Sequence, residues 1–288
     1  MAAHPEISIC AILTVRNEAH YLSQLLPRLA AQCIEVAVID HASSDGTWEL
    51  LQRYRGSPVI SVATLPYLGF FSLRQQLESK RRVIEGLSHD WLVHCDADEI
   101  LEHREPGKRL RDAIEEANQF ECNAINFEEF TFIPEPNRDY AEHDYVAEMR
   151  RYYFFQIRKN WMHRAWKREA KLDNVAGAGH VLRGDGLRLS PYTHVMRHYI
   201  GLSQEHIWRK YLDRVFDPDE IARGWHRDRK ALTREQLLLP GSSPYIQHLD
   251  ARPNECLCRG SAVVSHYWHW RRGDQATPAV GERDFDEV

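Results

Sequence analysis

The first half of the chain alternates short apolar runs with segments whose leucines recur at helical spacing, and this alternation restricts the fold more than any other feature. Residues 7–15 are almost continuously apolar, which is typical of a strand buried on both faces. The leucines within 22–29 then lie on one face of a helix. Further strands are expected at 36–39, 59–63, 91–95, 124–127 and 130–133, and further helices at 48–54, 73–87 and 106–118. The pattern predicts an α/β protein whose mostly parallel sheet is covered by helices.

The second half of the chain is less regular. Residues 150–157 are aromatic and strand-like, and residues 176–179 predict a tight turn or loop. Ser203 is suited to cap a helix that runs to Phe216. The acidic tail at 273–288 is expected to fray. We expect a single domain in which this second half wraps the first.

The composition limits the function. The 288 residues are 43% hydrophobic and 27% charged, as in soluble globular proteins. Acidic residues outnumber basic ones by 42 to 37, which argues against nucleic acid as the main partner. The longest uncharged stretch, residues 56–73, contains prolines and a glycine, so we interpret it as strand plus loop and predict no transmembrane segment. Six scattered cysteines and no glycosylation sequon predict a cytoplasmic protein without disulfides.

Three carboxylates follow the apolar run at 91–95 directly, in the sequence Asp96-Ala97-Asp98-Glu99. In an open parallel sheet, ligands bind beyond the carboxyl ends of the strands. Alternate residues of an extended chain face the same side, and hard carboxylate oxygens suit Mg²⁺ or Mn²⁺ bridging a diphosphate. The alternative is a helix N-terminus, where acidic side chains offset the helix dipole.

Two other polar loops follow strands of the same expected sheet. TVRNE at residues 14–18 follows the first strand, and DHASSDGT at residues 40–47 follows the second. Taken alone, each is as consistent with a structural turn as with a site. Because the carboxyl ends of parallel strands meet at one edge of a sheet, we expect both loops to gather beside the acidic residues.

In this order and spacing, the three motifs resemble those of family 2 glycosyltransferases of the GT-A fold. The resemblance covers about residues 7–135 and is looser to about residue 215. It implies a GT-A-like three-layer α/β/α sandwich with a C-terminal α+β extension. Residues 1–135 would be the nucleotide-sugar-binding half, and residues 136–272 would supply the acceptor side and complete the metal site. The family also implies a nucleotide-sugar donor, a divalent metal and inversion at the anomeric carbon.

The resemblance assigns expected roles to individual residues. Glu18 and Asp40 would contact the nucleoside, and Asp98 would hold the metal. Asp96 would face the ribose or the metal. Arg74 lies where such enzymes often place a diphosphate-binding arginine, although a surface helix arginine is the alternative. The full expected donor-binding set is Thr14, Arg16, Glu18, Asp40, Arg74 and Asp96.

The chain also departs from the family pattern. His41 follows Asp40 where many members have a second aspartate, and no Glu-Asp dipeptide occurs to supply the usual base. The Gln-X-X-Arg-Trp motif and the membrane helices of processive synthases are missing, which favours a non-processive enzyme. The candidate bases are Glu128, Glu129, Asp173 and His180.

Histidines could complete a metal site. His198-Tyr-Ile-Gly-Leu-Ser is similar to a late segment of some GT-A enzymes in which the histidine binds the metal, so we favour His198 as a ligand, followed by His180. A structural role is the alternative for both, as it is for His194. Structural zinc is not expected, because the Cys256–Cys258 spacer is too short.

The leading hypothesis is therefore a glycosyltransferase that uses Mn²⁺ or Mg²⁺ and a nucleotide-sugar donor, with a glycan, lipid-linked or small-molecule acceptor. A basic run at 223–230 leaves peripheral membrane contact open, and the aromatic run at 266–270 is expected to pack in the core. One alternative is a sugar-phosphate nucleotidyltransferase, although residues 14–19 lack the glycines that such an enzyme needs. The other is a nucleotide-sugar-binding protein without catalysis.

Overall fold

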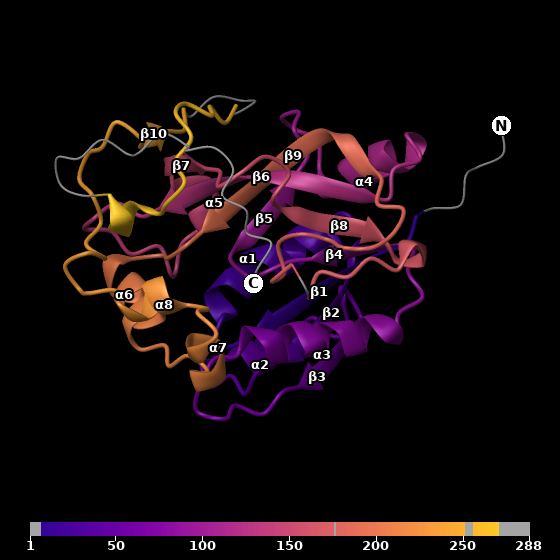
Figure 1. Ribbon diagram of the computed structural model, residues 1–288, viewed down its shortest axis with the longest axis horizontal. Coiled ribbons are helices and arrows are strands. Elements are labelled where there is room, and N and C mark those ends of the chain that lie inside the picture. The colour runs from indigo at the N-terminus through magenta and orange to yellow at the C-terminus, as the bar shows by residue number, and fades with distance from the viewer. Residues whose placement is uncertain (1–6, 176, 251–255, 271–288) are drawn as a thin grey trace.

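The computed structural model describes residues 7–175, 177–250 and 256–270 (Figure 1). The strands are β1 (Ile9–Val15), β2 (Glu35–Asp40), β3 (Val59–Thr64), β4 (Trp91–His94), β5 (Glu99–Glu102), β6 (Ala124–Ile133), β7 (Arg151–Phe155), β8 (His163–Lys167), β9 (Leu189–Tyr199) and β10 (Gln247–His248). The helices are α1 (Ala19–Ala30), α2 (Thr47–Arg53), α3 (Leu73–Glu85), α4 (Leu110–Gln119), α5 (Tyr145–Glu148), α6 (Gln204–Leu212), α7 (Pro218–Ala222) and α8 (Arg227–Lys230). Two 3-10 turns, η1 (Arg168–Ala170) and η2 (Tyr267–His269), complete the described elements. The acidic tail at 273–288 lies outside the described residues.

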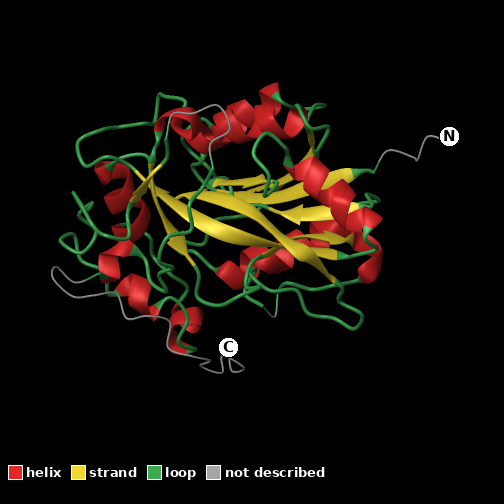
Figure 2. Ribbon diagram, turned by 90° about the horizontal axis from the view of Figure 1, so that it is seen from above, coloured by secondary structure: helices red, strands yellow, loops and turns green. Residues whose placement is uncertain are grey.

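The strands within the described residues form one ten-stranded sheet. Eight of them follow the order β10-β7-β6-β8-β4-β1-β2-β3, and the other two, β9 and β5, branch from β6. Strands β3, β2, β1 and β4 are parallel neighbours. Strand β9 runs parallel to β6 and antiparallel to β5, and β8, β7 and β10 add antiparallel pairs. Figure 2 shows helices on both faces of this sheet, so the expected three-layer α/β/α sandwich is confirmed.

Strand β1 is buried on both faces, as its continuous apolar run predicts. Ala11 and Leu13 join the core cluster that contains Leu22 of α1. Ile12 points to the opposite face and joins a cluster against which Val83 of α3 packs. Burying an aliphatic side chain of this size stabilises the fold by roughly 1.5–3 kcal/mol, so the two clusters fix the register of the strand between its helices.

Strand β6 differs from the prediction of two short strands at 124–127 and 130–133. It is one strand of ten residues, because Glu128 and Glu129 continue the pairing instead of interrupting it. Glu129 lies opposite Phe155 of β7 and Met196 of β9.

Two helix boundaries also differ from the sequence prediction. Helix α4 begins at Leu110 instead of Pro106, because residues 103–108 form a turn and the Arg109 N–H donates to Asp112 Oδ2 at 2.6 Å. Helix α6 ends at Leu212, four residues earlier than expected. Its predicted start is confirmed, since the Ser203 hydroxyl accepts the His206 N–H at 3.2 Å.

The second half of the chain packs across the first. Glu220 of α7 accepts the N–H groups of Leu73 and Arg74, at 3.1 and 2.7 Å, and also the hydroxyl of Ser72 at 2.9 Å. A carboxylate almost 150 residues away therefore satisfies the first turn of α3. The aromatic run near the end packs in the core as predicted, with Trp268 among its buried members.

Candidate functional site

The three carboxylates form a tight turn between two strands. Strand β4 ends at His94, and β5 begins at Glu99, whose N–H donates to the carbonyl of Asp96 at 3.0 Å. The alternative interpretation of these acidic residues as a helix N-terminus is therefore wrong. The turn, which we call the acid turn (residues 96–99), lies at the carboxyl end of β4, the edge at which parallel sheets bind ligands.

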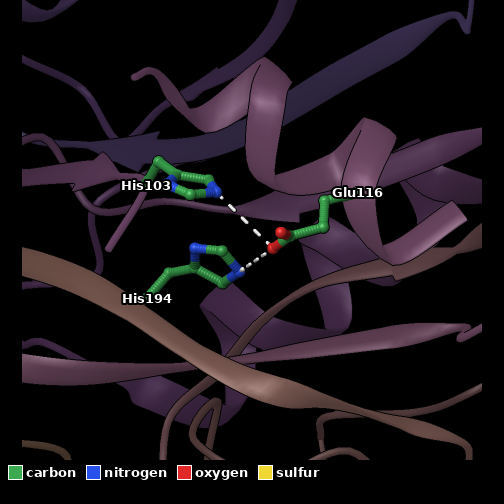
Figure 3. A group of neighbouring side chains, drawn as sticks. All are labelled: His103, Glu116 and His194. Carbon is green, nitrogen blue, oxygen red and sulfur yellow. Dashed lines mark ion pairs between the residues drawn. The ribbon is translucent and has the colours of Figure 1, made fainter. Parts of the chain in front are cut away.

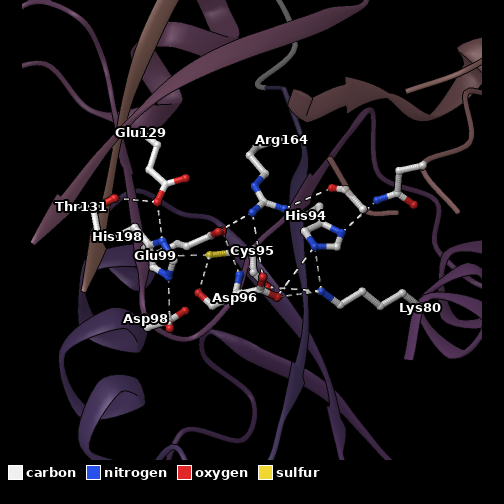
Figure 4. A network of polar contacts seen from close by, with 12 residues as sticks. Lys80, His94, Cys95, Asp96, Asp98, Glu99, Glu129, Thr131, Arg164 and His198 are labelled. Carbon is white, nitrogen blue, oxygen red and sulfur yellow. Dashed lines mark hydrogen bonds and ion pairs between the residues drawn. The ribbon is translucent and has the colours of Figure 1, made fainter. Parts of the chain in front are cut away.

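Asp98 is held between two basic side chains that come from the second half of the chain: Lys210, and His198, which Figure 4 draws beside it. Its Oδ2 lies 2.5 Å from Lys210 Nζ of α6 and 3.5 Å from Nε2 of His198. The other ring nitrogen of His198 lies 2.6 Å from Glu129 Oε1. Thr131 donates to the same Glu129 oxygen at 2.8 Å. The result is a continuous carboxylate–imidazole–carboxylate chain that ends at the acid turn.

The charges in this chain shift one another's pKa values. Burial alone would lower the pKa of His198, but the charges of Glu129 and Asp98 outweigh it and raise that pKa well above its usual value. Burial would raise the pKa of Asp98, but Lys210 and His198 hold it well below the ordinary range. The same imidazolium lowers the pKa of Glu129 to about 2 against the effect of burial. The chain is therefore ionised throughout at neutral pH.

Asp96 has a different environment. Its side chain is 47% exposed, yet the two cations beside it, Lys80 and Arg164, are almost wholly buried. Lys80 Nζ lies 3.3 Å from Asp96 Oδ1, and Arg164 Nη2 lies 3.9 Å from Oδ2. Arg164 also forms an ion pair with Glu99 and donates to the Gly179 carbonyl at 3.1 Å. Burial raises the pKa of Glu99 to about 7, although Arg164 opposes this.

Opposite charges are matched within this cluster. Four side chains are acidic and four are basic when His198 is protonated, and every member contacts at least one of opposite sign. The acidic members are Asp96, Asp98, Glu99 and Glu129, and the basic members are Lys80, Arg164, His198 and Lys210. Buried carboxylates require such partners, so the acid turn is neutralised by the protein's own side chains.

The two polar loops gather at the same edge as expected. Val15 pairs with Asp40 across β1 and β2, so both loops leave the sheet together. Arg16 joins them by donating to the carbonyls of His41 and Ala42 at 2.7 and 2.6 Å. Its guanidinium also stacks 3.6 Å above the ring of Tyr67. Arg16 thus shapes the loops through backbone contacts.

Two acidic members of these loops, Glu18 and Asp40, are partly or fully buried, whereas Asp45 is exposed. Asp40 is 5% exposed and accepts the Ser43 N–H at 3.3 Å. Burial raises the pKa of Glu18 to about 8, with Lys210 opposing the shift and Asp98 adding to it, so Glu18 lies within electrostatic reach of the acid turn. The Thr14 hydroxyl is buried and has no hydrogen-bond partner among the described residues.

Arg74 has the arrangement of a surface helix arginine. Its side chain is 54% exposed and lies 2.8 Å from Glu78, one helical turn later. No contact with the acid turn is seen for it within the described residues. Its place at the start of α3 keeps it on the same side of the molecule as Ser72 and Glu220.

The candidate bases differ in how they are engaged. Glu129 is bound to His198, and Glu128 lies 2.8 Å from Arg259. Asp173 accepts the Val175 N–H at 2.8 Å in a local turn. Among these four candidates, only His180 has a buried side-chain polar atom without a hydrogen-bond partner in the described part of the chain. That atom is its ring nitrogen Nδ1.

The ring of His180 stacks on Trp161 with centroids 5.7 Å apart. Burial lowers the pKa of His180 to about 4, assisted by the positive charge of Arg164. The charges of Glu129 and Asp96 act in the opposite direction. His180 is therefore a neutral imidazole within electrostatic reach of the acid turn.

Three members of the site were missed in the sequence: Lys80, Arg164 and Lys210. One indication was available for Lys80, which continues the apolar stripe of α3 with Leu77 and Ile84 and therefore occupies a buried position. The partners of these cations lie far away in the chain, with Lys210 and Asp98 separated by 112 residues. Local patterns do not reveal such pairs.

A second cluster, His103, Glu116 and His194, brings two imidazoles and a carboxylate within 4.8 Å of one another (Figure 3). Each Nε2 faces Glu116 Oε2, at 3.5 Å for His103 and 3.7 Å for His194. Both Nδ1 atoms accept backbone N–H groups: His103 from Glu105 at 2.9 Å, and His194 from Arg104 at 3.2 Å. Neutral rings must then carry their protons on Nε2, the atoms that a metal would need.

Arg104 also binds both carboxylate oxygens of Glu116 and offsets its charge. This cluster therefore serves to join the loop after β5 to α4 and β9. The structural interpretation of His194 agrees with the geometry, since His194 lies four residues before His198 on β9, away from the acid turn.

An acid turn at the carboxyl edge of a parallel sheet, flanked by two polar loops in a three-layer sandwich, is the architecture of a GT-A-type protein. Residues 10–170 match the profile described as Glycosyl transferase family 2, which is more than half of the chain. The chain belongs to this family. None of its described helices combines the length and apolar character needed to cross a membrane.

Among curated proteins, the chain is similar to the lipopolysaccharide core biosynthesis glycosyltransferase LpsC of Rhizobium meliloti (strain 1021), with 30% identity over 114 residues. The matched segment spans 39% of this chain and 37% of LpsC. Among solved structures, S. aureus TarS 1-349 in complex with UDP gives a TM-score of 0.44 at 12% identity and covers 81% of this chain and 76% of TarS. Its complex with UDP-GlcNAc gives 0.43 at 13% identity, with coverages of 81% and 70%.

Proposed function

We propose that this protein is a metal-dependent glycosyltransferase. It transfers a sugar from a nucleoside-diphosphate donor to an acceptor hydroxyl, with inversion and without processivity. The observation that supports this most is the convergence of the acid turn with the loops at 14–18 and 40–47 on one edge of parallel strands. Membership of glycosyl transferase family 2 supports the same conclusion.

The nucleoside is proposed to bind over the two polar loops. Glu18 and Asp40 contact the base or ribose, while Thr14 and Arg16 maintain the loop shape through the sheet and through backbone carbonyls. Asp96, whose carboxylate is half exposed, meets the ribose or the metal. The diphosphate then lies over the acid turn, with Arg74 at its outer side.

The side chains at the acid turn fit a divalent ion. Asp98 offers hard oxygens and Asp96 an accessible carboxylate, while Nε2 of His198 faces Asp98. The other His198 nitrogen is held by Glu129, as is typical of metal-bound histidines. We propose Asp96, Asp98 and His198 as ligands, the ion taking the place of the proton on Nε2. Bound Mn²⁺ or Mg²⁺ would neutralise the charge of the departing nucleoside diphosphate.

His180 is proposed as the general base. In a single displacement, the acceptor oxygen bonds to the anomeric carbon while the bond from that carbon to the phosphate oxygen breaks, which inverts the configuration. The hydroxyl proton moves to the imidazole of His180, whose pKa of about 4 keeps the ring neutral.

The acceptor class follows from chemistry and from one relative. A lipid-linked saccharide is the first class to test, because LpsC carries a name from lipopolysaccharide core biosynthesis. Free glycans and small hydroxyl compounds are the other classes, and the basic residues at 223–230 would favour an anionic acceptor or membrane surface.

Function is tested first by a thermal-shift screen of nucleoside diphosphates and their sugars with and without Mn²⁺. A ligand that binds only the folded protein raises Tm by mass action. Slow hydrolysis of the selected donor to the nucleoside diphosphate is expected. Pyrophosphate release from a nucleoside triphosphate would instead indicate a nucleotidyltransferase, and tight binding without turnover would indicate a binding protein.

The base is tested by His180→Ala, which should lower the rate of transfer by roughly 10²- to 10⁴-fold, the usual contribution of a general base. Donor affinity should stay unchanged. Asp173→Asn is the matched control, because the Asp173 carboxylate serves a local turn, and it should keep most of the activity. Full activity in His180→Ala would exclude His180 as the base.

A further inference from the structure

The ammonium of Lys210 lies where the charge of a metal ion would act. Its Nζ is 2.5 Å from Asp98 Oδ2, and the two side chains are only 11% and 13% exposed. Helix α6 carries Lys210 to this position from its N-cap at Ser203, where the hydroxyl accepts the His206 N–H. This is a contact between two side chains that are each almost nine-tenths buried, and it differs from a surface ion pair, which contributes little.

The same oxygen of Asp98 faces two cationic groups. Lys210 Nζ and His198 Nε2 both approach Oδ2, at 2.5 and 3.5 Å. A divalent ion that bound this oxygen would have to displace the ammonium, because two cations at such separations repel each other strongly in a partly buried site. The metal and Lys210 therefore compete for Asp98.

Charge balance indicates when this exchange can occur. The acid turn and Glu129 are already matched by four basic side chains, so an ion alone would add two positive charges to a neutral cluster. A donor diphosphate brings about two negative charges. The ion and the diphosphate together leave the balance unchanged, and a lysine has enough rotatable bonds to move its Nζ while its helix stays in place.

We propose that Lys210 is an internal counter-ion of Asp98 that prevents metal binding until the donor diphosphate arrives, when the ammonium turns from Asp98 to the phosphates. This inference rests on the proposed function, because it takes Asp98 as a metal ligand. It assigns Lys210 as a positioning residue that couples metal binding to donor binding. It predicts weak binding of Mn²⁺ alone and much tighter binding in the presence of the nucleoside diphosphate.

The test is calorimetric titration of Mn²⁺ into metal-free protein, with and without the nucleoside diphosphate selected by the thermal-shift screen. Lys210→Met should bind Mn²⁺ alone roughly tenfold or more tightly than the wild type, since a charge-assisted contact no longer opposes the ion. The gain in Mn²⁺ affinity from the nucleotide should shrink by a similar factor. Metal-free nucleotide affinity should fall.

Two further variants serve as controls. Arg209→Met removes an equal charge from the exposed face of α6 and should leave Mn²⁺ binding within about twofold of the wild type. Lys210→Arg keeps a cation at Asp98 and should keep Mn²⁺ binding as weak as in the wild type. If Lys210→Met fails to fold in metal-free buffer, a cooperative thermal transition that returns when Mn²⁺ alone is added supports the proposal. If no such transition returns, the proposal is overturned.

The two possible failures are distinguishable. Equal or weaker Mn²⁺ binding in folded Lys210→Met overturns the role of Lys210 while the proposed function stands. A wild-type protein that binds no nucleoside diphosphate with or without Mn²⁺ contradicts the proposed function itself, before any variant is compared.

Discussion

Removing the buried guanidinium of Arg164 should destabilise the protein strongly. Arg164 is 3% exposed, forms an ion pair with Glu99, which is 2% exposed, and lies 3.9 Å from Asp96. Arg164→Met keeps much of the volume but leaves the Glu99 carboxylate buried without its cation. Breaking a buried pair in this way costs about 3–5 kcal/mol, which for a chain of this size corresponds to a fall in Tm of roughly 10 °C.

The loss should depend on pH in a defined direction. The pKa of Glu99 is already raised from 4.5 to about 7, and removing Arg164 raises it further. The folded state then binds a proton that the unfolded state has lost, so stability falls as pH rises from about 4.5 through the raised value. Arg164→Met should therefore be less destabilised at pH 6 than at pH 8, as measured by urea unfolding.

The double variant Arg164→Met, Glu99→Gln is the matched control. It removes the unpaired charge and should recover more than half of the lost free energy of unfolding at pH 8, because replacing both members of a buried pair costs less than replacing one. A loss below about 1 kcal/mol for the single variant, with no difference between the two pH values, would refute the reasoning.

Three other substitutions test the remaining assignments. Asp98→Asn should abolish transfer and also lower Tm in metal-free buffer, because Lys210 and His198 lose their shared counter-ion; wild-type turnover at saturating Mn²⁺ would contradict this. Arg74→Ala should weaken binding of the nucleoside diphosphate more than that of the free nucleoside, measured by calorimetry, and equal losses would leave Arg74 as a surface residue paired with Glu78. His198→Ala should remove the pH dependence of metal-assisted donor binding. In the wild type that affinity should rise with pH across the neutral range, because the raised pKa of His198 keeps a proton on the ring with which the metal must compete; an identical pH profile in the variant would exclude His198.

Local patterns were sufficient to predict the first half of the fold. The elements from β1 to β4 lie within about three residues of their predicted ranges, because each is defined by a continuous apolar run or by apolar periodicity over a few turns. The prediction failed where a distant partner changes what a residue can do. The predicted strands at 124–127 and 130–133 left Glu129 between them, but His198 and Thr131 supply contacts that let its carboxylate lie inside one continuous strand.

The same reason limits prediction of the site. Asp96 and Asp98 could be recognised because they follow a strand directly, and their placement at the sheet edge is where the pattern put them. The basic residues that neutralise them come from α3, β8 and α6, and nothing local marks Arg164 in a strand or Lys210 on a helix as a member of a site. Charge matching across the fold is decided only once the chain is assembled.

The contact between Glu220 and the first turn of α3 has a consequence for dissection of the molecule. The backbone N–H groups that would attract a phosphate at that helix end already hold a carboxylate, so this helix end is not free to bind a phosphate. A fragment that ended before α7 would free those groups and create an anion site at a place that Glu220 occupies in the longer chain. Phosphate binding by such a fragment would result from the removal of Glu220 and would not identify a donor-binding site.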